Sequence, residues 1–337
     1  MGLVDDESQE LTVHDQLDLF GLDACVQAVL GNETLASADR RRALRRIEAA
    51  SRVMCEVSPD EVAFLHAGLC QTGLPHSRPS TNWEPWQRSN GRFHLIVEPG
   101  TLVNQSGKAA HVGVPYGPKA RLIFMFINTE GVKSKNVLLG RSMSAWMRRL
   151  GLHVSGGDNG TIRPFKEQTL RLGRARFSFQ FEAEGGGIGV SDVQLADKLH
   201  LWVTDESAPW LEEVELTEKF RDHLREHAVP LCDHAVAYLS DSCLKLDFYA
   251  WAAWRLPRLQ RPLRLNWQQL AATFSCSDEP KRLAERLRKV IPEVRTVYRD
   301  MRVEFTRGGL ILFPSKPPVP KTLVQVQHQL RDCPEPC

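Results

Sequence analysis

Three groups of side chains in the sequence have types and spacings that could do chemistry. His223 and His227 are one helical turn apart, which suits a zinc site, but a leucine replaces the glutamate of an HExxH motif and no third ligand is evident. We interpret this pair as a solvated helix face. Segment 185–189 is glycine-rich but lacks the Lys-Ser or Lys-Thr of a phosphate loop, so it is interpreted as a turn. The third group is basic: five of the nine residues 281–289 are Lys or Arg.

Positive charge is concentrated in two parts of a chain whose overall formal charge is only +2. Residues 116–182 hold 12 basic and 4 acidic residues, and residues 243–316 hold 15 and 7, a net charge of +8 in each. Residues 1–39 hold nine acids and no Lys or Arg, and residues 183–242 hold 4 bases and 13 acids, a net charge of −9 in each. Local positive charge attracts phosphate backbones, whereas acidic stretches disfavour non-specific binding to them. The pattern therefore indicates a nucleic-acid partner.

The elements that must position these bases occur twice, in segments 121–152 and 246–275. Each segment begins with an apolar helical run, crosses a short basic loop and a few strand-like residues, and reaches a helix N-cap at Ser142 or Asn266. After each cap the apolar residues recur at helical spacing, and a polar turn, a second amphipathic helix and a strand hairpin follow. This order is the plan of a winged helix. We predict an α+β fold with two tandem winged-helix domains and an N-terminal helical extension.

The last helix of each winged unit is expected to enter the DNA groove, because the second helix of a helix-turn-helix does so. In the first unit this helix should run from Thr161 to about Gly173, with an inner face formed by Ile162, Phe165, Thr169 and Leu172. In the second unit a cap at Ser277 or Asp278 should start a helix that Pro292 interrupts or redirects, with an inner stripe formed by Leu283, Leu287, Val290 and Ile291. Strands 301–305 and 310–314 should form its wing.

Helical arginines can reach base edges or phosphates, and a wing arginine suits the negative potential of a minor groove. The candidate DNA-binding residues are therefore Lys281, Arg282, Arg286, Arg288, Lys289, Arg299, Arg302 and Arg307 in the second unit and Arg163, Lys166 and Arg171 in the first. The alternative is that both helices are ordinary solvated faces. A single Glu285 among five bases argues against this alternative for helix 281–289, whereas for 161–172 the two interpretations stay balanced.

The remaining sequence is divided by composition and local pattern. Helices are expected at 37–54, from the cap Ser58 to about Gln71, and at 216–227 and 231–239; residues 72–91 should form a loop, and 92–97 and 100–104 a hairpin. The expected parts of the chain are an acidic flexible segment 1–36, a first winged-helix domain 37–205, an acidic helical connector 206–242, a second winged-helix domain 243–316 and a Pro-rich tail 317–337.

Composition predicts a cytoplasmic protein without a bound metal or cofactor. Eight cysteines are scattered with no CxxC pair, which indicates reduced thiols. The longest strongly apolar run, 122–127, is far shorter than the roughly 20 residues of a membrane span. The N-terminus has no basic region followed by an apolar stretch, so no secretory signal is expected. No cluster of nucleophile, base or metal ligands supports an enzyme.

Three segments match a known family in order and spacing. VGVPYGPKARLIFMFINTEGVKSKNVLLGRSMSAWMRRLGL (112–152), LDFYAWAAWRL (246–256) and GGLILFPSKPPV (308–319) resemble plasmid-encoded RepA replication initiators. The resemblance covers roughly residues 90–320, although Gly131 stands where the family pattern has alanine and helix 281–291 is more basic than expected.

The resemblance implies a replication initiator without enzymatic activity. Such a protein would bind repeated origin sequences (iterons), help to open adjacent AT-rich DNA, and recruit the host initiator and the replicative helicase. It would form homodimers in exchange with monomers, with the first winged domain supplying the dimer surface and backbone contacts and the second the main base readout.

Two other functions remain open. A double winged-helix transcriptional repressor would use the same DNA contacts, although the sequence shows no effector pocket or separate oligomerisation domain. A protein-interaction adaptor would tolerate charge reversal at Lys281, Arg282, Arg286 and Lys289.

Overall fold

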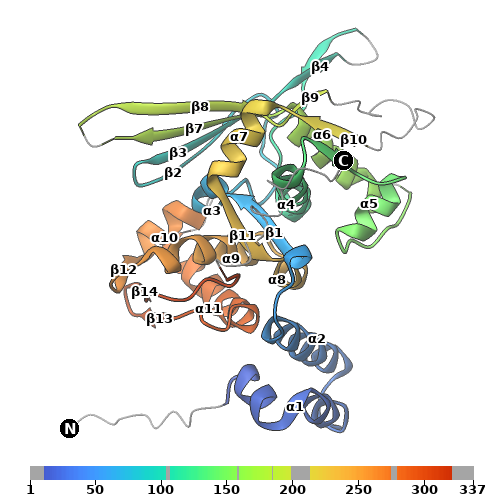
Figure 1. The fold of residues 1–337 in the computed structure, drawn as a ribbon, viewed down its shortest axis with the longest axis vertical. Coiled ribbons are helices and arrows are strands. Elements are labelled where there is room, and N and C mark those ends of the chain that lie inside the picture. Colours follow the sequence, from blue (N-terminus) through green and yellow to red (C-terminus); the bar gives the residue numbers. More distant parts are fainter. Residues whose placement is uncertain are drawn as a thin grey trace, which may run out of the picture.

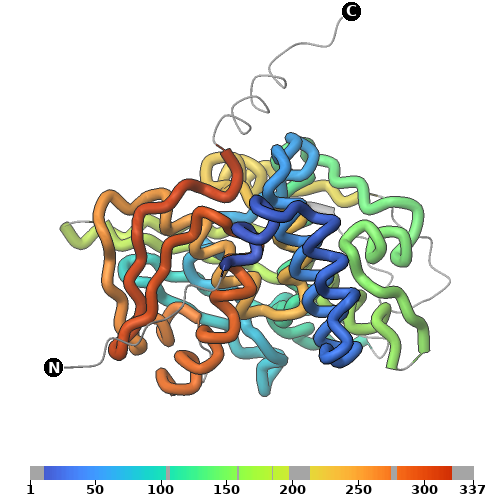
Figure 2. The backbone as a smooth tube through the Cα atoms, turned by 90° about the horizontal axis from the view of Figure 1, so that it is seen from below, coloured from blue at the N-terminus to red at the C-terminus, as the bar shows by residue number. Residues whose placement is uncertain are grey.

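The computed structural model describes residues 11–103, 107–157, 159–183, 185–198, 213–274 and 279–320. Along its longest axis the molecule has a pair of N-terminal helices at one end, the C-terminal winged unit in the middle and a long antiparallel sheet at the other end (Figure 1). Seen from below, the N-terminal helices lie beside the C-terminal unit (Figure 2). No helix within the described ranges is long and apolar enough to span a membrane.

The C-terminal winged unit has the element order that the sequence predicts. Its elements are α9 (Cys243–Arg255), the short 3-10 helix η2 (Leu256–Arg258), β12 (Leu263–Asn266), α10 (Trp267–Phe274), α11 (Pro280–Val297), β13 (Val303–Thr306) and β14 (Gly309–Leu312). The strands form an antiparallel sheet in the order β12-β14-β13. Asn266 caps α10 as predicted, because its side-chain oxygen accepts from the Gln269 N–H at 2.8 Å while Gln269 Oε1 accepts from the Asn266 N–H at 2.9 Å.

Helix α11 continues through Pro292, so the predicted interruption is wrong. Proline removes one backbone hydrogen bond, but Val294 and Val297 beyond it are buried, and their packing keeps the last turns helical. The predicted inner stripe, which includes Leu283 and Leu287, is buried and confirmed. The predicted caps, Ser277 and Asp278, lie outside the described residues.

The first winged unit follows the same plan with additional strands. Its elements are α4 (Gly117–Lys133), β6 (Asn136–Leu138), α5 (Met143–Arg149), α6 (Ile162–Arg174), β7 (Arg176–Glu182), β8 (Ile188–Gln194), β9 (Ala196–Lys198) and β10 (Glu213–Leu216). Ser142 caps α5 as predicted, accepting from the Ala145 N–H at 3.1 Å. β10 lies between β6 and β9. Leu216 of β10 occupies the space that a Cβ at Gly131 would need, 2.6 Å from its Cδ1, which accounts for glycine at that position.

Strand pairing over long sequence distances overturns three local predictions. Ser58 starts only the 3-10 helix η1 (Pro59–Glu61), and the expected helix is replaced by β1 (Val62–His66) and the short α3 (Ala67–Thr72). All five residues of β1 are buried and pair with β11 (Ala228–Cys232). A short apolar run fits a strand or a buried helix equally well, and the pairing with β11 makes this run a strand.

The expected loop 72–91 contains β2 (Trp86–Asn90), and the expected hairpin of 92–97 with 100–104 is absent. Instead, β3 (Phe93–Glu98) pairs with β2 and β7, which gives a four-stranded sheet in the order β2-β3-β7-β8. β4 (Thr101–Val103) pairs with β5 (Ala109–His111). The first unit's wing is thereby widened into the long sheet of Figure 1.

The N-terminal extension is helical, as predicted. α2 (Ser37–Met54) has the predicted bounds, and Arg46 donates to Thr296 Oγ1 of α11 at 3.2 Å. α1 (Val13–Leu30) forms within the segment 1–36, where the sequence shows only a weak helical pattern. Its few inward residues pack with Ile47 and Ala50 of α2 in a small core separate from the main one. The predicted flexibility of this segment stays a prediction.

One continuous hydrophobic core runs through both winged units. It includes Phe124 and Trp146 from the first unit and Trp251 and Leu287 from the second. α4 packs on β1 and α9 packs on β11, so the β1–β11 pair lies between the two units. α7 (Glu218–His227) and α8 (Asp233–Leu239), in the segment predicted as a helical connector, also contribute to this core. The two units are therefore joined by packing and not by an exposed linker.

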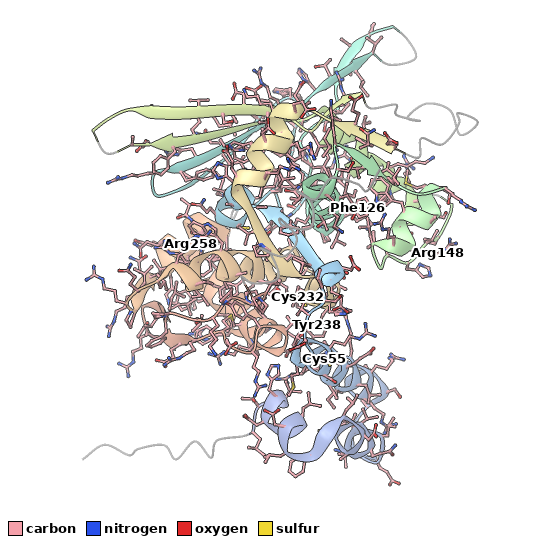
Figure 3. All side chains as sticks on the ribbon, in the orientation of Figure 1. Cys55, Phe126, Arg148, Cys232, Tyr238 and Arg258 are labelled. Carbon is pink, nitrogen blue, oxygen red and sulfur yellow. The ribbon has the colours of Figure 1, made fainter. Side chains whose placement is uncertain are left out.

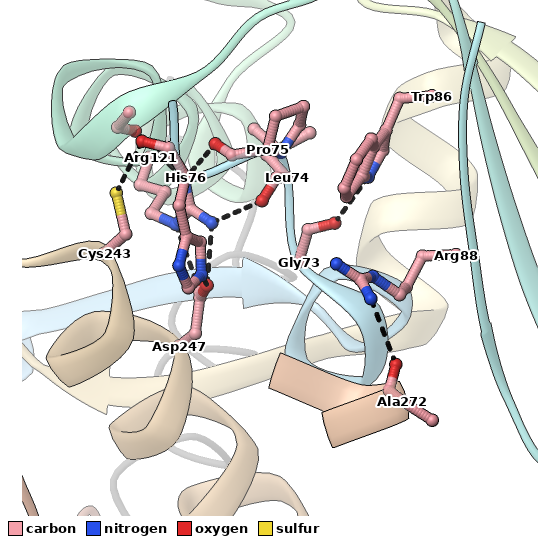
Figure 4. Close-up of polar contacts among 11 residues, drawn as sticks. Gly73, Leu74, Pro75, His76, Trp86, Arg88, Arg121, Cys243, Asp247 and Ala272 are labelled. Carbon is pink, nitrogen blue, oxygen red and sulfur yellow. Dashed lines mark hydrogen bonds and ion pairs between the residues drawn. The ribbon is translucent and has the colours of Figure 1, made fainter. Parts of the chain in front are cut away.

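A buried ion pair crosses the boundary between the two units (Figure 4). The guanidinium of Arg121 in α4 is bidentate on Asp247 in α9, with Nε–Oδ1 and Nη2–Oδ2 distances of 2.6 and 2.7 Å. Arg121 also donates to three backbone carbonyls, and His76 Nε2 lies 2.9 Å from Asp247 Oδ2. Burial alone would raise the pKa of Asp247, but Arg121 and His76 outweigh it and lower the pKa to about 2. The carboxylate is thus ionised and fully bonded.

Candidate nucleic-acid interface

The outer surface of α11 presents a row of cations. Lys281, Arg282, Arg288 and Lys289 are exposed, and Arg286 is half-buried. Among the described residues Lys281, Arg282 and Lys289 form no ion pair. Arg282 and Lys289 are separated by nearly two turns and lie on the face opposite the buried Leu287, so they point directly away from the core. Cations placed in this way are available to phosphates and base edges.

The β13–β14 wing lies beside α11 and is fixed to α10. Trp267 N and Nε1 donate to Gly308 O and Arg307 O of the wing turn at 3.1 and 3.2 Å. Arg307 is exposed at this turn, as predicted. The guanidinium of Arg288 lies 6.0 Å from the Phe305 ring on β13, which connects the helix to the wing. Helix and wing therefore form one basic surface.

Two further predicted residues are exposed but already have partners. Arg302 lies over the Phe313 ring at 5.2 Å, a contact that leaves its charge accessible. Arg299 pairs with Asp18 of α1 at 2.6 Å, with about half of each side chain exposed. The acidic N-terminal helix thus neutralises one cation at the border of the basic surface.

In the first unit, two of the three predicted DNA-binding residues are accessible and one is buried. Arg163 is exposed and Lys166 half-buried, and both remain candidates. The expectation that Arg171 faces outward is wrong, because only 1% of it is exposed. Its guanidinium pairs with Glu167 at 2.9 Å and donates to Val114 O at 3.0 Å. Helix α6 has a second buried face because segment 112–116 packs against it, so Arg171 positions that segment and cannot reach DNA.

Sequence reasoning left out other exposed bases. Arg264 is exposed on the outer face of the wing sheet, where it lies opposite Ile311 in the β12–β14 register. The alternation of Leu263, Arg264 and Leu265 indicated that Arg264 faces outward, since every second side chain of a strand shares a face. Arg258, near the start of β12, and Arg148, on α5 of the first unit, are also exposed (Figure 3).

The histidine pair on α7 meets a third histidine in the structure. His66 is 2% exposed, and its Nδ1 accepts from the Gly68 N–H at 3.0 Å. The proton of neutral His66 is therefore on Nε2, which donates to His223 Nδ1 at 2.9 Å. Both rings stack on Phe179, and His227 approaches edge-on. Among the described residues no group of three or more His, Cys, Asp or Glu side chains is arranged to hold a metal ion.

This histidine cluster predicts acid sensitivity. Burial, followed by the neighbouring histidines, lowers the pKa of His66 well below 6.5, and burial and His227 lower the pKa of His223. The unfolded chain then binds protons that the folded chain does not, so the free energy of unfolding should fall as the pH drops below about 6.5. Urea unfolding at about pH 7.5 and 5.5 measures this loss. His223→Gln should reduce the loss and the exposed control His153→Gln should not; an equal loss in both variants contradicts the assignment.

Comparison with known proteins shows a similarity to one protein family. Residues 114–270 match the family model described as plasmid encoded RepA protein. The chain is similar to this family over these residues, here called the RepA segment, which make up slightly less than half of its length. The resemblance seen in the sequence is thus confirmed over the first winged unit, α7 to α9 and the start of α10. The RepA segment ends before α11 and the wing, so the basic residues of that surface lie outside the match.

Two solved structures are similar in fold. One is the crystal structure of the RctB domains 2-3, RctB-155-483, with 11% identity and a TM-score of 0.44 over 79% of this chain and 100% of that chain. The other is a selenomethionine derivative of domains 2 and 3 of RctB, with 12% identity and a TM-score of 0.43 over 75% of this chain and 96% of that chain. No curated protein matches the sequence.

Proposed function

We propose that this chain is a plasmid replication initiator that binds iterons in an origin, promotes opening of adjacent DNA and recruits the host initiator and replicative helicase. The observation that carries the proposal is the basic surface of α11 and its wing. There, Arg282 and Lys289 are exposed, point away from the core and have no ion-pair partner among the described residues. The RepA segment in the same chain supports initiation as the process that uses this surface. Catalysis by the chain itself is not part of the proposal.

The docking follows from the shapes of the elements. α11 would lie in a major groove with Lys281, Arg282 and Lys289 on base edges and phosphates, while Arg307 would reach the adjacent minor groove. The first unit would contact backbone through Arg163 and Lys166, with fewer free cations than α11. The second unit would therefore provide most of the sequence readout.

An edge strand supports self-association of the first unit. β8 is at the edge of the sheet β2-β3-β7-β8 and carries Ile188 and Val190, which are 64% and 57% exposed. Phe181 on the adjacent strand is 54% exposed. Unpaired strand edges with apolar side chains bind other strands readily. A homodimer through this edge, in exchange with monomers, is the arrangement that we propose.

Repression of the chain's own promoter is the second candidate function, because a dimer with two basic surfaces would suit an inverted repeat. The two functions share the DNA contacts and differ in the step after binding. Permanganate reactivity of unpaired thymines next to the bound site distinguishes them, since only an initiator opens the duplex.

The test of DNA binding is a titration at several salt concentrations, with fragments of the replicon that encodes this chain and random DNA of equal length. For six or more phosphate contacts, affinity should fall by about 1,000-fold or more between about 50 and 200 mM salt. Repeat-specific binding with this steep dependence is the expected result. Equal, weak binding to both kinds of DNA would contradict the proposal.

A further inference from the structure

Helix α1 is broken in the middle at a glycine. The helix begins with a capping box between Thr12 and Asp15 and ends at Gly31, but Gly21 has φ 78° and ψ 167°, outside the helical region. A residue with a side chain would be strained at this positive φ, so glycine is what permits the break. The break turns the chain immediately after Phe20, and the two halves of α1 present different faces.

Large apolar side chains at this break are left in solvent. Leu19 is 64%, Phe20 61% and Leu22 43% exposed, although α1 also contributes Leu17 and Cys25 to the small core with α2. Because burial of apolar side chains stabilises the folded state, three exposed apolar neighbours forgo a large stabilisation. Adjacent exposed apolar residues of this size are typical of interaction sites.

The charges around the break select the kind of partner. Asp15, Asp18 and Asp23 flank the apolar side chains and are exposed. Asp18 already pairs with Arg299 of this chain, which shows that the acidic side of α1 accepts a guanidinium. A second copy of α1 would bring the same three carboxylates together and is disfavoured by like-charge repulsion. An apolar pocket with a basic rim is the complementary surface.

We propose that residues 16–23, Gln-Leu-Asp-Leu-Phe-Gly-Leu-Asp, are a docking segment for a host replication protein. Leu19 and Phe20 would insert into an apolar pocket, and Asp18 and Asp23 would pair with Lys or Arg at its rim. A short segment with adjacent leucine and phenylalanine anchors suits a groove, because a few buried side chains supply most of the affinity of such interfaces. The choice of a replication protein rests on the proposed function, whereas the docking chemistry does not.

The docking segment lies at the border of the DNA-binding surface. The Asp18–Arg299 pair is one contact between α1 and the region after α11, and Arg299 is a candidate DNA-binding residue. A partner or a phosphate that takes one member of this pair frees the other. Docking of the partner and binding of DNA should therefore favour each other.

The experiment measures binding of the full chain to three purified host proteins separately: the replicative helicase, the initiator and the sliding clamp of the DNA polymerase. The variant Leu19→Ala with Phe20→Ala is compared with a control, Val103→Ala with Leu138→Ala, whose side chains are 67% and 58% exposed elsewhere. We expect one host protein to bind, with affinity reduced about 10-fold or more in the α1 variant and unchanged in the control. Asp23→Lys should weaken the same interaction while preserving the apolar contacts.

Origin binding is measured on the same preparations, so that failure of docking and failure of the proposed function are distinguishable. The α1 variant should bind origin DNA within about 2-fold of wild type and unfold at the same denaturant midpoint. The proposal is overturned if none of the three proteins binds, or if the α1 variant binds as well as wild type. Self-association that disappears in the α1 variant would also overturn it, because the occupant would then be a second copy.

Discussion

Replacement of Asp247 by Asn should destabilise the folded chain by about 3–5 kcal/mol, the cost typical of removing one member of a buried ion pair. Arg121 is 4% exposed and Asp247 14%, so water cannot replace the lost partner. Arg121 would keep its three carbonyl acceptors, but its charge would remain buried without a counter-ion. Urea unfolding at about pH 7 measures the loss as a shift of the midpoint at an unchanged m-value.

The matched control is Asp241→Asn. Asp241 precedes α9, is 50% exposed and pairs with Lys245 of α9 at 3.2 Å. Removal of this exposed pair should cost only about 0–1 kcal/mol. A loss of less than about 1 kcal/mol for Asp247→Asn would contradict the assigned role. Acid adds a further check: because the pKa of Asp247 is lowered to about 2, its stabilisation should be complete above about pH 4 and lost as pH falls below it.

The double variant Arg282→Ala with Lys289→Ala should weaken specific DNA binding by about 100-fold or more at about 150 mM salt, since each of the two charged hydrogen bonds contributes about 1.5–3 kcal/mol. Both side chains are exposed on the face of α11 opposite the core, so the fold should not change. If both contact phosphates, the slope of log affinity against log salt should decrease in magnitude by about 1.8. If one contacts a base, the slope changes less and discrimination against random DNA falls more.

The control for this variant is Lys219→Ala with Arg225→Ala, which removes two exposed cations from α7. This control variant loses the same net charge as the α11 variant. A difference between the two therefore reports local contacts of α11 and not the overall charge of the protein. Equal effects of the two double variants on affinity and slope would show that α11 has no special role. The adaptor alternative predicts no effect of either variant on function.

The elements that could be predicted from sequence are those whose signals are local. The caps at Ser142 and Asn266 and the apolar stripe of α11 are set by residues within a few positions of one another. The same holds for α2, whose arginines are crowded into its first turns. In these cases the spacing of apolar residues along the sequence matches the side of the helix that is buried in the structure.

The failures have long-range causes. Residues 62–66 become a strand because β11, more than 160 residues later, supplies the partner edge, and no local pattern specifies that pairing. Arg171 is buried because segment 112–116 covers a second face of α6, which the spacing within α6 does not reveal. Likewise, the spacing of His223 and His227 indicated a solvated pair, but His66 at the end of β1 stacks on His223.

The continuous core and the Arg121–Asp247 pair have a mechanical consequence for DNA. Because the two winged units cannot swing about a linker, the spacing and angle between α6 and α11, the helices that we propose to face DNA, are fixed before binding. A duplex that engages both units must supply any bend or twist itself, at a cost that depends on its base steps. Selection among target sequences would then include the flexibility of base pairs that the protein never touches.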